Sequence, residues 1–98
     1  MGEIDRIMEI IREHFVFTGR VQGVGFRYKV SRMAHHYKVT GWIRNNANGS
    51  VEAQLQGREE ALDQIVQQLN QDAYIRIDWI AREHMEPDRE ERGFSVRY

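Results

Sequence analysis

The sequence predicts an α+β fold in which two helices cover one face of an antiparallel sheet of four or five strands. Three observations lead to this class. Five short segments alternate apolar and polar residues, as half-buried strands do, and two longer segments repeat apolar residues every three or four positions, as amphipathic helices do. These segments share 98 residues, which is a suitable length for one domain with a modest core.

Each element is supported by its own pattern and by the residues that separate it from the next. A glycine-rich stretch separates the first strand from the first helix, Asn48-Gly49 is a strong hairpin signal, and Gly57 precedes the second helix. In chain order we expect a strand over 14–18, a helix that begins at 26 and ends before 40, strands over 42–46 and 50–56, a helix over 58–69, and strands over 75–81 and 94–98.

This order, β-α-β-β-α-β with one further short strand, predicts the ferredoxin-like arrangement, in which both helices pack on the same face of the sheet. Residues 14–98 form this domain, and residues 1–13 form an N-terminal extension. Apolar residues recur at roughly helical spacing in 4–11, and either a short amphipathic helix or a partly ordered tail fits that pattern. We expect Trp42 and Trp79 in the core.

The amino-acid composition excludes several classes of function. The chain has no cysteine, which rules out disulfides, thiolate catalysis and cysteine-ligated metals and fits a reducing compartment. No signal peptide or membrane-spanning segment is recognisable, so we expect a cytoplasmic protein. The net charge of −1 hides an asymmetry, because residues 14–51 contain six Lys and Arg but no Asp or Glu. This basic half favours a small anionic partner, since a nucleic-acid binder usually carries more net positive charge.

The most informative stretch is Gly19–Arg27, which reads GRVQGVGFR. Glycines between a strand and a helix allow several main-chain N–H groups to converge on one anion, and the helix start adds unpaired donors. A first helical turn usually prefers acids, yet this one carries Arg27 and Lys29 and no carboxylate. The stretch lacks the Walker A lysine and the third glycine of the dinucleotide fingerprint. Taken alone, it leaves an anion site and a plain tight turn as alternatives.

Together with GWIRNNANGSVE at 41–52 and FSVRY at 94–98, this stretch resembles the acylphosphatase family over about residues 14–98. The resemblance implies a cofactor-independent enzyme that hydrolyses the carboxyl–phosphate bond of small acyl phosphates to carboxylate and inorganic phosphate. It implies that Asn45 orients the attacking water and that Arg27 and the preceding loop hold the phosphate. The implied phosphate-binding residues are Arg20, Val21, Gln22, Gly23, Val24, Gly25 and Arg27.

These residue types suit that chemistry. The carboxylate leaving group has a conjugate acid of pKa about 4 and needs no general acid, and phosphoryl transfer depends mainly on positioning and charge stabilisation. Arg27 offers bidentate, permanently charged donors, and Asn45 offers both a carbonyl and an amide to a water, whereas Asn46 and Asn48 suit the turn. The group that accepts the water proton stays open, and the substrate's phosphate is one candidate.

No metal site is expected, because His35 and His36 are adjacent on a helix and point apart. We expect inorganic phosphate or sulfate to act as inhibitors, a monomer, and neither nucleic acid nor a membrane as partner. Two other functions stay open at this point. One is an inactive anion- or acyl-phosphate-binding module. The other is RNA binding on the open sheet face, against which Glu52 in the third strand argues.

Overall fold

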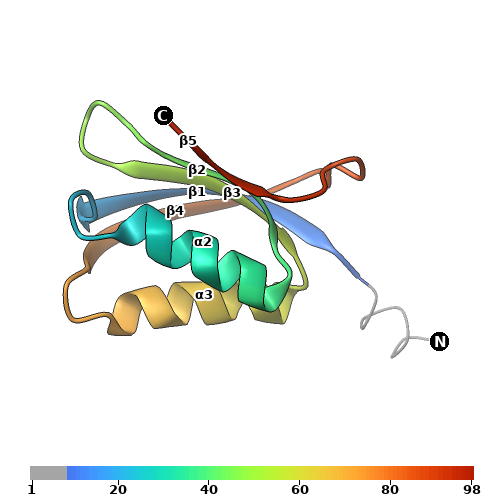
Figure 1. Cartoon of the computed structure of the whole chain (residues 1–98), viewed down its shortest axis with the longest axis horizontal. Helices are drawn as coiled ribbons and strands as arrows, with labels where there is room; N and C mark the ends of the chain where they lie inside the picture. The colour runs from blue at the N-terminus through green and yellow to red at the C-terminus, as the bar shows by residue number, and fades with distance from the viewer. Residues whose placement is uncertain (1–8) are drawn as a thin grey trace.

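The computed structural model describes residues 9–98 and confirms the α+β sandwich (Figure 1). Both helices lie on one face of a single sheet, and the other face of the sheet is uncovered by helix (Figure 1). The elements in chain order are β1 (Ile11–Arg20), α2 (Phe26–Tyr37), β2 (Thr40–Asn45), β3 (Val51–Gly57), α3 (Glu59–Gln71), β4 (Arg76–Met85) and β5 (Phe94–Arg97).

The sheet has the strand order β4-β1-β3-β2-β5. As the ferredoxin-like arrangement requires, β1 pairs antiparallel with β3 and β4, and β2 pairs antiparallel with β3. The expectation of a wholly antiparallel sheet needs one correction, because β5 pairs with β2 in parallel. The chain reverses direction after β4, and β2 also runs opposite to β4, so β5 meets β2 running the same way.

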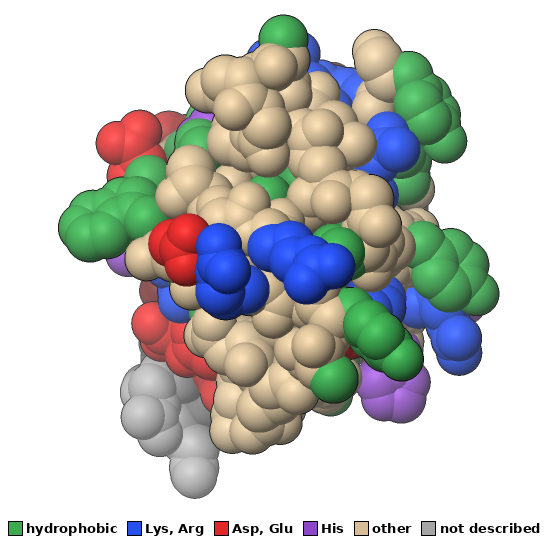
Figure 2. All heavy atoms as spheres, turned by 90° about the vertical axis from the view of Figure 1, so that its left-hand side faces the viewer, with side chains coloured by type: hydrophobic (Ala, Val, Ile, Leu, Met, Phe, Trp, Pro, Cys, Tyr) green, Lys and Arg blue, Asp and Glu red, His purple; other side chains and the backbone are tan. Residues whose placement is uncertain are grey.

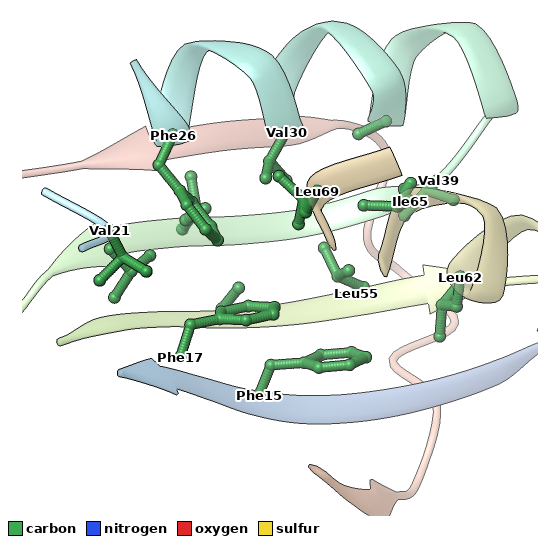
Figure 3. Close-up of a cluster of buried hydrophobic side chains, with 14 of the residues drawn as sticks. Phe15, Phe17, Val21, Phe26, Val30, Val39, Leu55, Leu62, Ile65 and Leu69 are labelled. Carbon is green, nitrogen blue, oxygen red and sulfur yellow. The ribbon is translucent and has the colours of Figure 1, made fainter. Parts of the chain in front are cut away.

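The core lies between the helices and the sheet (Figure 3). Phe15 and Phe17 of β1 are buried, and their rings stack with centroids 5.5 Å apart. Phe26, the first residue of α2, brings its ring to 5.0 Å from Phe17. Full burial of such a side chain stabilises a fold by about 1.5–3 kcal/mol. Val21, which directly follows β1, is also fully buried, so the chain entering the β1–α2 loop is anchored in the core.

The first strand starts earlier than the sequence predicts. Ile11, Arg12 and Glu13, at the end of the segment assigned to the extension, belong to β1, where Ile11 pairs opposite Gly57. Arg12 and Glu13 are buried. Residues 1–8, which carry most of the proposed amphipathic helix, lie outside the described residues.

The expectation that Trp79 lies in the core is wrong, because its side chain is 69% exposed. The reason is an irregularity in the β1–β4 ladder: Thr18 pairs with Trp79, but Gly19 pairs with Ile77, so Asp78 is an extra residue in β4. A bulge of this kind shifts the alternation of the strand. Ile80 therefore packs on the core, and Trp79 faces away from it. Trp42 is buried, as expected, but on the helix-free face, where the Arg97 guanidinium lies 4.4 Å from its ring centroid.

The charged segment 86–93 is held to the sheet by two buried side chains. Arg12 Nη1 donates a hydrogen bond of 2.9 Å to Glu91, and Gln56 pairs with both the N–H and the carbonyl of Asp88, at 2.7 and 2.9 Å. Glu91 is therefore a partner in an ion pair rather than part of a solvated charged loop. These contacts lead the chain across the helix-free face to β5.

Candidate functional site

The connection between β1 and α2, residues 21–25, is called the glycine loop below. Gly23 and Gly25 adopt φ angles of 74° and 76°, in the left-handed region that a side chain makes costly. Gly25 is also the N-cap of α2 and provides no side-chain cap to the helix start. Both glycines are therefore required by the backbone path, and they leave the helix start uncovered.

Main-chain donors collect at this helix start. Following the described chain from the glycine loop into α2, Lys29 is the first residue whose N–H donates a main-chain hydrogen bond. Its acceptor is the Gly25 carbonyl, at 2.9 Å. Within residues 9–98, the N–H groups of residues 22–28, which precede it, donate no main-chain hydrogen bond. The first turn of α2 contains no acid, whereas α3 begins with Glu59 and Glu60. An anion at the start of α2 would satisfy these donors and the helix dipole.

A cavity of about 310 Å³, called the loop cavity, opens beside these donors. It brings together Arg27 of α2 and Asn45 at the end of β2, the two residues to which the sequence analysis assigns catalytic roles. The cavity is lined by Val21, Gln22, Gly23, Gly25, Phe26, Arg27, Tyr28, Ser31, Asn45, Val96 and Tyr98.

Two of the expected phosphate-binding residues lie outside this lining. Arg20 is the last residue of β1, is exposed, and pairs with Arg76 of β4. Val24 is half-buried and packs against the core. The Arg20 side chain is thus exposed to solvent, and the Val24 side chain contributes to the core.

The three asparagines near the hairpin differ in their contacts. Asn46 donates to the Ser50 hydroxyl at 3.0 Å, and Asn48 accepts from the N–H and hydroxyl of Ser50 at 3.0 and 2.7 Å. Both residues therefore stabilise the turn, as expected. Asn45 makes no side-chain hydrogen bond with any residue in 9–98, and it lines the loop cavity. Its amide is available to a ligand or a water.

Two features of the site were not predicted from the sequence. Val96 and Tyr98 line the loop cavity, and the Arg27 guanidinium lies 5.0 Å from the Tyr98 ring centroid. The alternation of the last strand, which places Val96 and Tyr98 on one face, is the signal that points to them. Gln22 is the second feature: its side-chain amide donates to the Asn46 and Ser50 carbonyls at 2.8 and 2.9 Å. Nothing in the local sequence indicates that bond.

The end of the molecule that carries the loop is basic. Figure 2 shows Lys and Arg side chains across the middle and right of this end and acidic side chains mainly at the left and below. Acids near this end are paired with cations: Asp78 with Arg76 at 3.1 Å, and Asp72, after α3, with Lys29, whose Nζ lies 2.8 Å from the Asp72 carboxylate. The hydrogen bond from Lys29 lowers the pKa of the Asp72 carboxyl, and the N–H of Tyr74 adds to this effect. Among residues 9–98, Arg27, which lines the loop cavity, forms no ion pair.

The chemistry open to this arrangement is that of a non-metal anion site. Within residues 9–98 no group of three His, Cys, Asp or Glu side chains is placed to hold a metal ion. No helix of this part of the chain is long and apolar enough to cross a membrane. Main-chain donors, one guanidinium and one free amide can hold a tetrahedral anion and orient a neighbouring water.

Comparison with known proteins gives a consistent result. A sequence model of the acylphosphatase family matches residues 13–96. The chain is 40% identical over 90 residues to an acylphosphatase of Geobacillus kaustophilus, an alignment that covers 89% of this chain and 94% of that protein. The crystal structure of acylphosphatase from Bacillus subtilis superposes with a TM-score of 0.82 at 31% identity, covering 90% of this chain and 99% of that one. Full-length HypF in its phosphate- and nucleotide-bound form also matches, with a TM-score of 0.82 and 25% identity, over 92% of this chain but only 12% of that one.

Proposed function

The chain belongs to the acylphosphatase family and is therefore an enzyme that hydrolyses acyl phosphates, and we propose that the reaction takes place in the loop cavity. The observation that carries this proposal is the meeting of Arg27 and Asn45 in one cavity with the glycine loop. The two residues come from different elements and are 18 positions apart, so their meeting is a property of the fold.

In this proposal the phosphoryl oxygens accept hydrogen bonds from the glycine loop, the N–H groups that open α2, and Arg27. These donors stabilise the negative charge that develops in the transition state. Arg27 suits this task because guanidinium binds two oxygens at once and stays charged. The exposed ring of Tyr98 lies 5.0 Å from the guanidinium, at the distance of a cation–π contact.

Asn45 orients the attacking water toward phosphorus. The water oxygen forms a bond to phosphorus while the bond between phosphorus and the acyl oxygen breaks, and the electron pair leaves with the carboxylate. The products are a carboxylate, inorganic phosphate and one proton. The carboxylate leaves without being protonated, and the substrate's own phosphoryl group is the proposed first acceptor of the water proton.

In this proposal the reaction needs no cofactor. We also propose that the protein is cytoplasmic and acts as a monomer. Inorganic phosphate and sulfate inhibit by occupying the site of the transferred group. The alternative of a catalytically inactive binding module predicts anion binding without turnover. RNA binding is disfavoured because Glu52 and Arg44, on the helix-free face, pair with each other at 3.0 Å.

The deciding experiment is hydrolysis of benzoyl phosphate by the purified full-length protein, before and after dialysis against EDTA. We expect turnover that survives dialysis and is inhibited competitively by inorganic phosphate. Phosphate binding with no turnover would support the inactive module. Loss of activity that added Mg²⁺ or Zn²⁺ restores would contradict the metal-free mechanism.

A further inference from the structure

A second cavity, called the helix cavity, lies between α2 and α3. Its volume is about 540 Å³, and its lining includes Tyr28, Lys29, Arg32, His36, Gln68 and Asp72. Tyr28 also lines the loop cavity. The two cavities therefore adjoin at this one exposed tyrosine, on the first turn of α2.

The charges in the helix cavity do not cancel. Lys29 is paired with Asp72, at 2.8 Å, and that hydrogen bond is the main cause that lowers the pKa of the Asp72 carboxyl. Arg32 is exposed and forms no ion pair with any residue that the structure describes. Its guanidinium lies 5.8 Å from the centroid of the Tyr28 ring. Arg32 is thus a cation of the helix cavity that lies beside Tyr28, the residue shared with the loop cavity that contains Arg27.

We infer that Tyr28 and Arg32 form a second subsite, which binds an anionic group at the far end of the acyl chain of the substrate. The inference rests on the proposed function and specifies its substrate. With the phosphoryl group in the loop cavity, the acyl chain crosses the Tyr28 ring, and a second carboxylate or phosphate reaches Arg32. The substrates preferred by this chain are then acyl phosphates that carry a second negative charge.

Helix geometry sets the length of such a substrate. Tyr28 and Arg32 are one turn apart, so their side chains are neighbours about 6 Å apart along the helix axis. A spacer of about three methylene groups between the two carbonyl carbons spans a distance of this order. Apolar contact with the Tyr28 ring suits that spacer, and Arg32 suits the terminal charge because it can bind two oxygens at once.

The size of the preference follows from the exposure of Arg32. Ion pairs in water contribute little, about 0.2–1 kcal/mol, so the second anion changes kcat/KM a few-fold rather than by orders of magnitude. The second anion contacts Arg32 equally in the ground state and in the transition state. The preference should therefore appear in KM and leave kcat nearly the same. It should also weaken with salt.

The test compares two substrates in the full-length protein: glutaryl phosphate, which has a terminal carboxylate, and benzoyl phosphate, which has none. The measured quantity is the ratio of their kcat/KM values. We expect Arg32→Ala to lower this ratio about three- to fivefold, mainly through the KM for glutaryl phosphate, and Arg32→Glu to lower it further. Arg32→Lys should keep most of the preference. Arg58→Ala, which removes an exposed cation at the start of α3, is the matched control and should leave the ratio unchanged.

A ratio that is the same in Arg32→Ala and the parent protein, at low ionic strength, would overturn the second subsite while leaving the proposed function intact. A fall equal to that in Arg58→Ala would overturn it as well, because it would reflect net charge alone. Failure of the parent protein to hydrolyse either substrate would instead contradict the proposed function, and the inference with it.

Discussion

The Gln22 side-chain amide donates a hydrogen bond of 2.9 Å to the main-chain carbonyl of Ser50. Its second N–H donates to the Asn46 carbonyl at 2.8 Å. One side chain thus ties the glycine loop, which leads to Arg27, to the hairpin that follows Asn45. We therefore expect the relative position of the two proposed catalytic residues to depend on these two hydrogen bonds, and Gln22 to influence the reaction by positioning them.

Replacing Gln22 should lower activity through this geometry. Gln22→Ala removes one of two donors from each carbonyl, because the Asn46 carbonyl also accepts from the Gly49 N–H at 3.1 Å and the Ser50 carbonyl from the Asn46 N–H at 2.8 Å. The loss is therefore that of two hydrogen bonds, at about 0.5–1.5 kcal/mol each. We expect kcat for benzoyl phosphate to fall about tenfold or more and the melting temperature to drop by several degrees. Gln22→Glu should be at least as harmful, because a carboxylate cannot donate to the two carbonyls. The exposed Gln64→Ala is the control, and activity equal to that control would contradict the positioning role.

Arg27 tests the requirement for a bidentate cation. Arg27→Ala should abolish detectable turnover together with inhibition by phosphate, since removal of one charged donor from such a site costs about 10²-fold or more. Arg27→Lys should recover little, because ammonium cannot bind two oxygens in one plane. Steady-state kinetics with benzoyl phosphate measures both variants. Near-normal activity in Arg27→Lys would show that a point charge is sufficient.

The pair of Arg12 and Glu91 should be important for stability. Their side chains are only 6% and 15% exposed and lie 2.9 Å apart. Removing one partner leaves a largely buried charge uncompensated, so we expect Glu91→Ala to destabilise the fold by about 3 kcal/mol and to lower the melting temperature by more than about 10 °C. Arg44→Ala breaks the more exposed pair with Glu52 and should cost less than about 1 kcal/mol. Equal losses of stability in urea unfolding would contradict this account.

The sequence predicts the elements that are determined by local periodicity. The helix that the sequence predicts from residue 26, ending before residue 40, is confirmed as α2, Phe26–Tyr37. Its apolar stripe and the glycines on both sides of it are local signals. Strand alternation predicts only that Asn45 and Asn46 point to opposite faces, and the resemblance to the acylphosphatase family is what selects Asn45. The turn contacts of Asn46 are expected from hairpin chemistry.

What the sequence does not reveal depends on contacts between distant segments. Trp79 faces away from the core because of a bulge at Asp78. A bulge can be recognised only from the pairing of two strands, and the sequence of one strand does not show it. Glu91 meets Arg12 across 79 positions, and Gln22 reaches Ser50 across 28. Such pairings follow from the tertiary arrangement, which no local pattern specifies.

The most direct test of the proposed mechanism compares Asn45→Ala with Asn46→Ala. Asn45 lines the loop cavity, whereas Asn46 is bonded to Ser50 in the turn. If Asn45 orients the attacking water, its contribution is made chiefly in the transition state, so its loss lowers kcat and changes binding little. We expect Asn45→Ala to hydrolyse benzoyl phosphate at least about 10²-fold more slowly with an inhibition constant for phosphate within about twofold of the parent, and Asn46→Ala to retain near-normal kcat. A large loss of kcat in Asn46→Ala, with Asn45→Ala unaffected, would contradict the account.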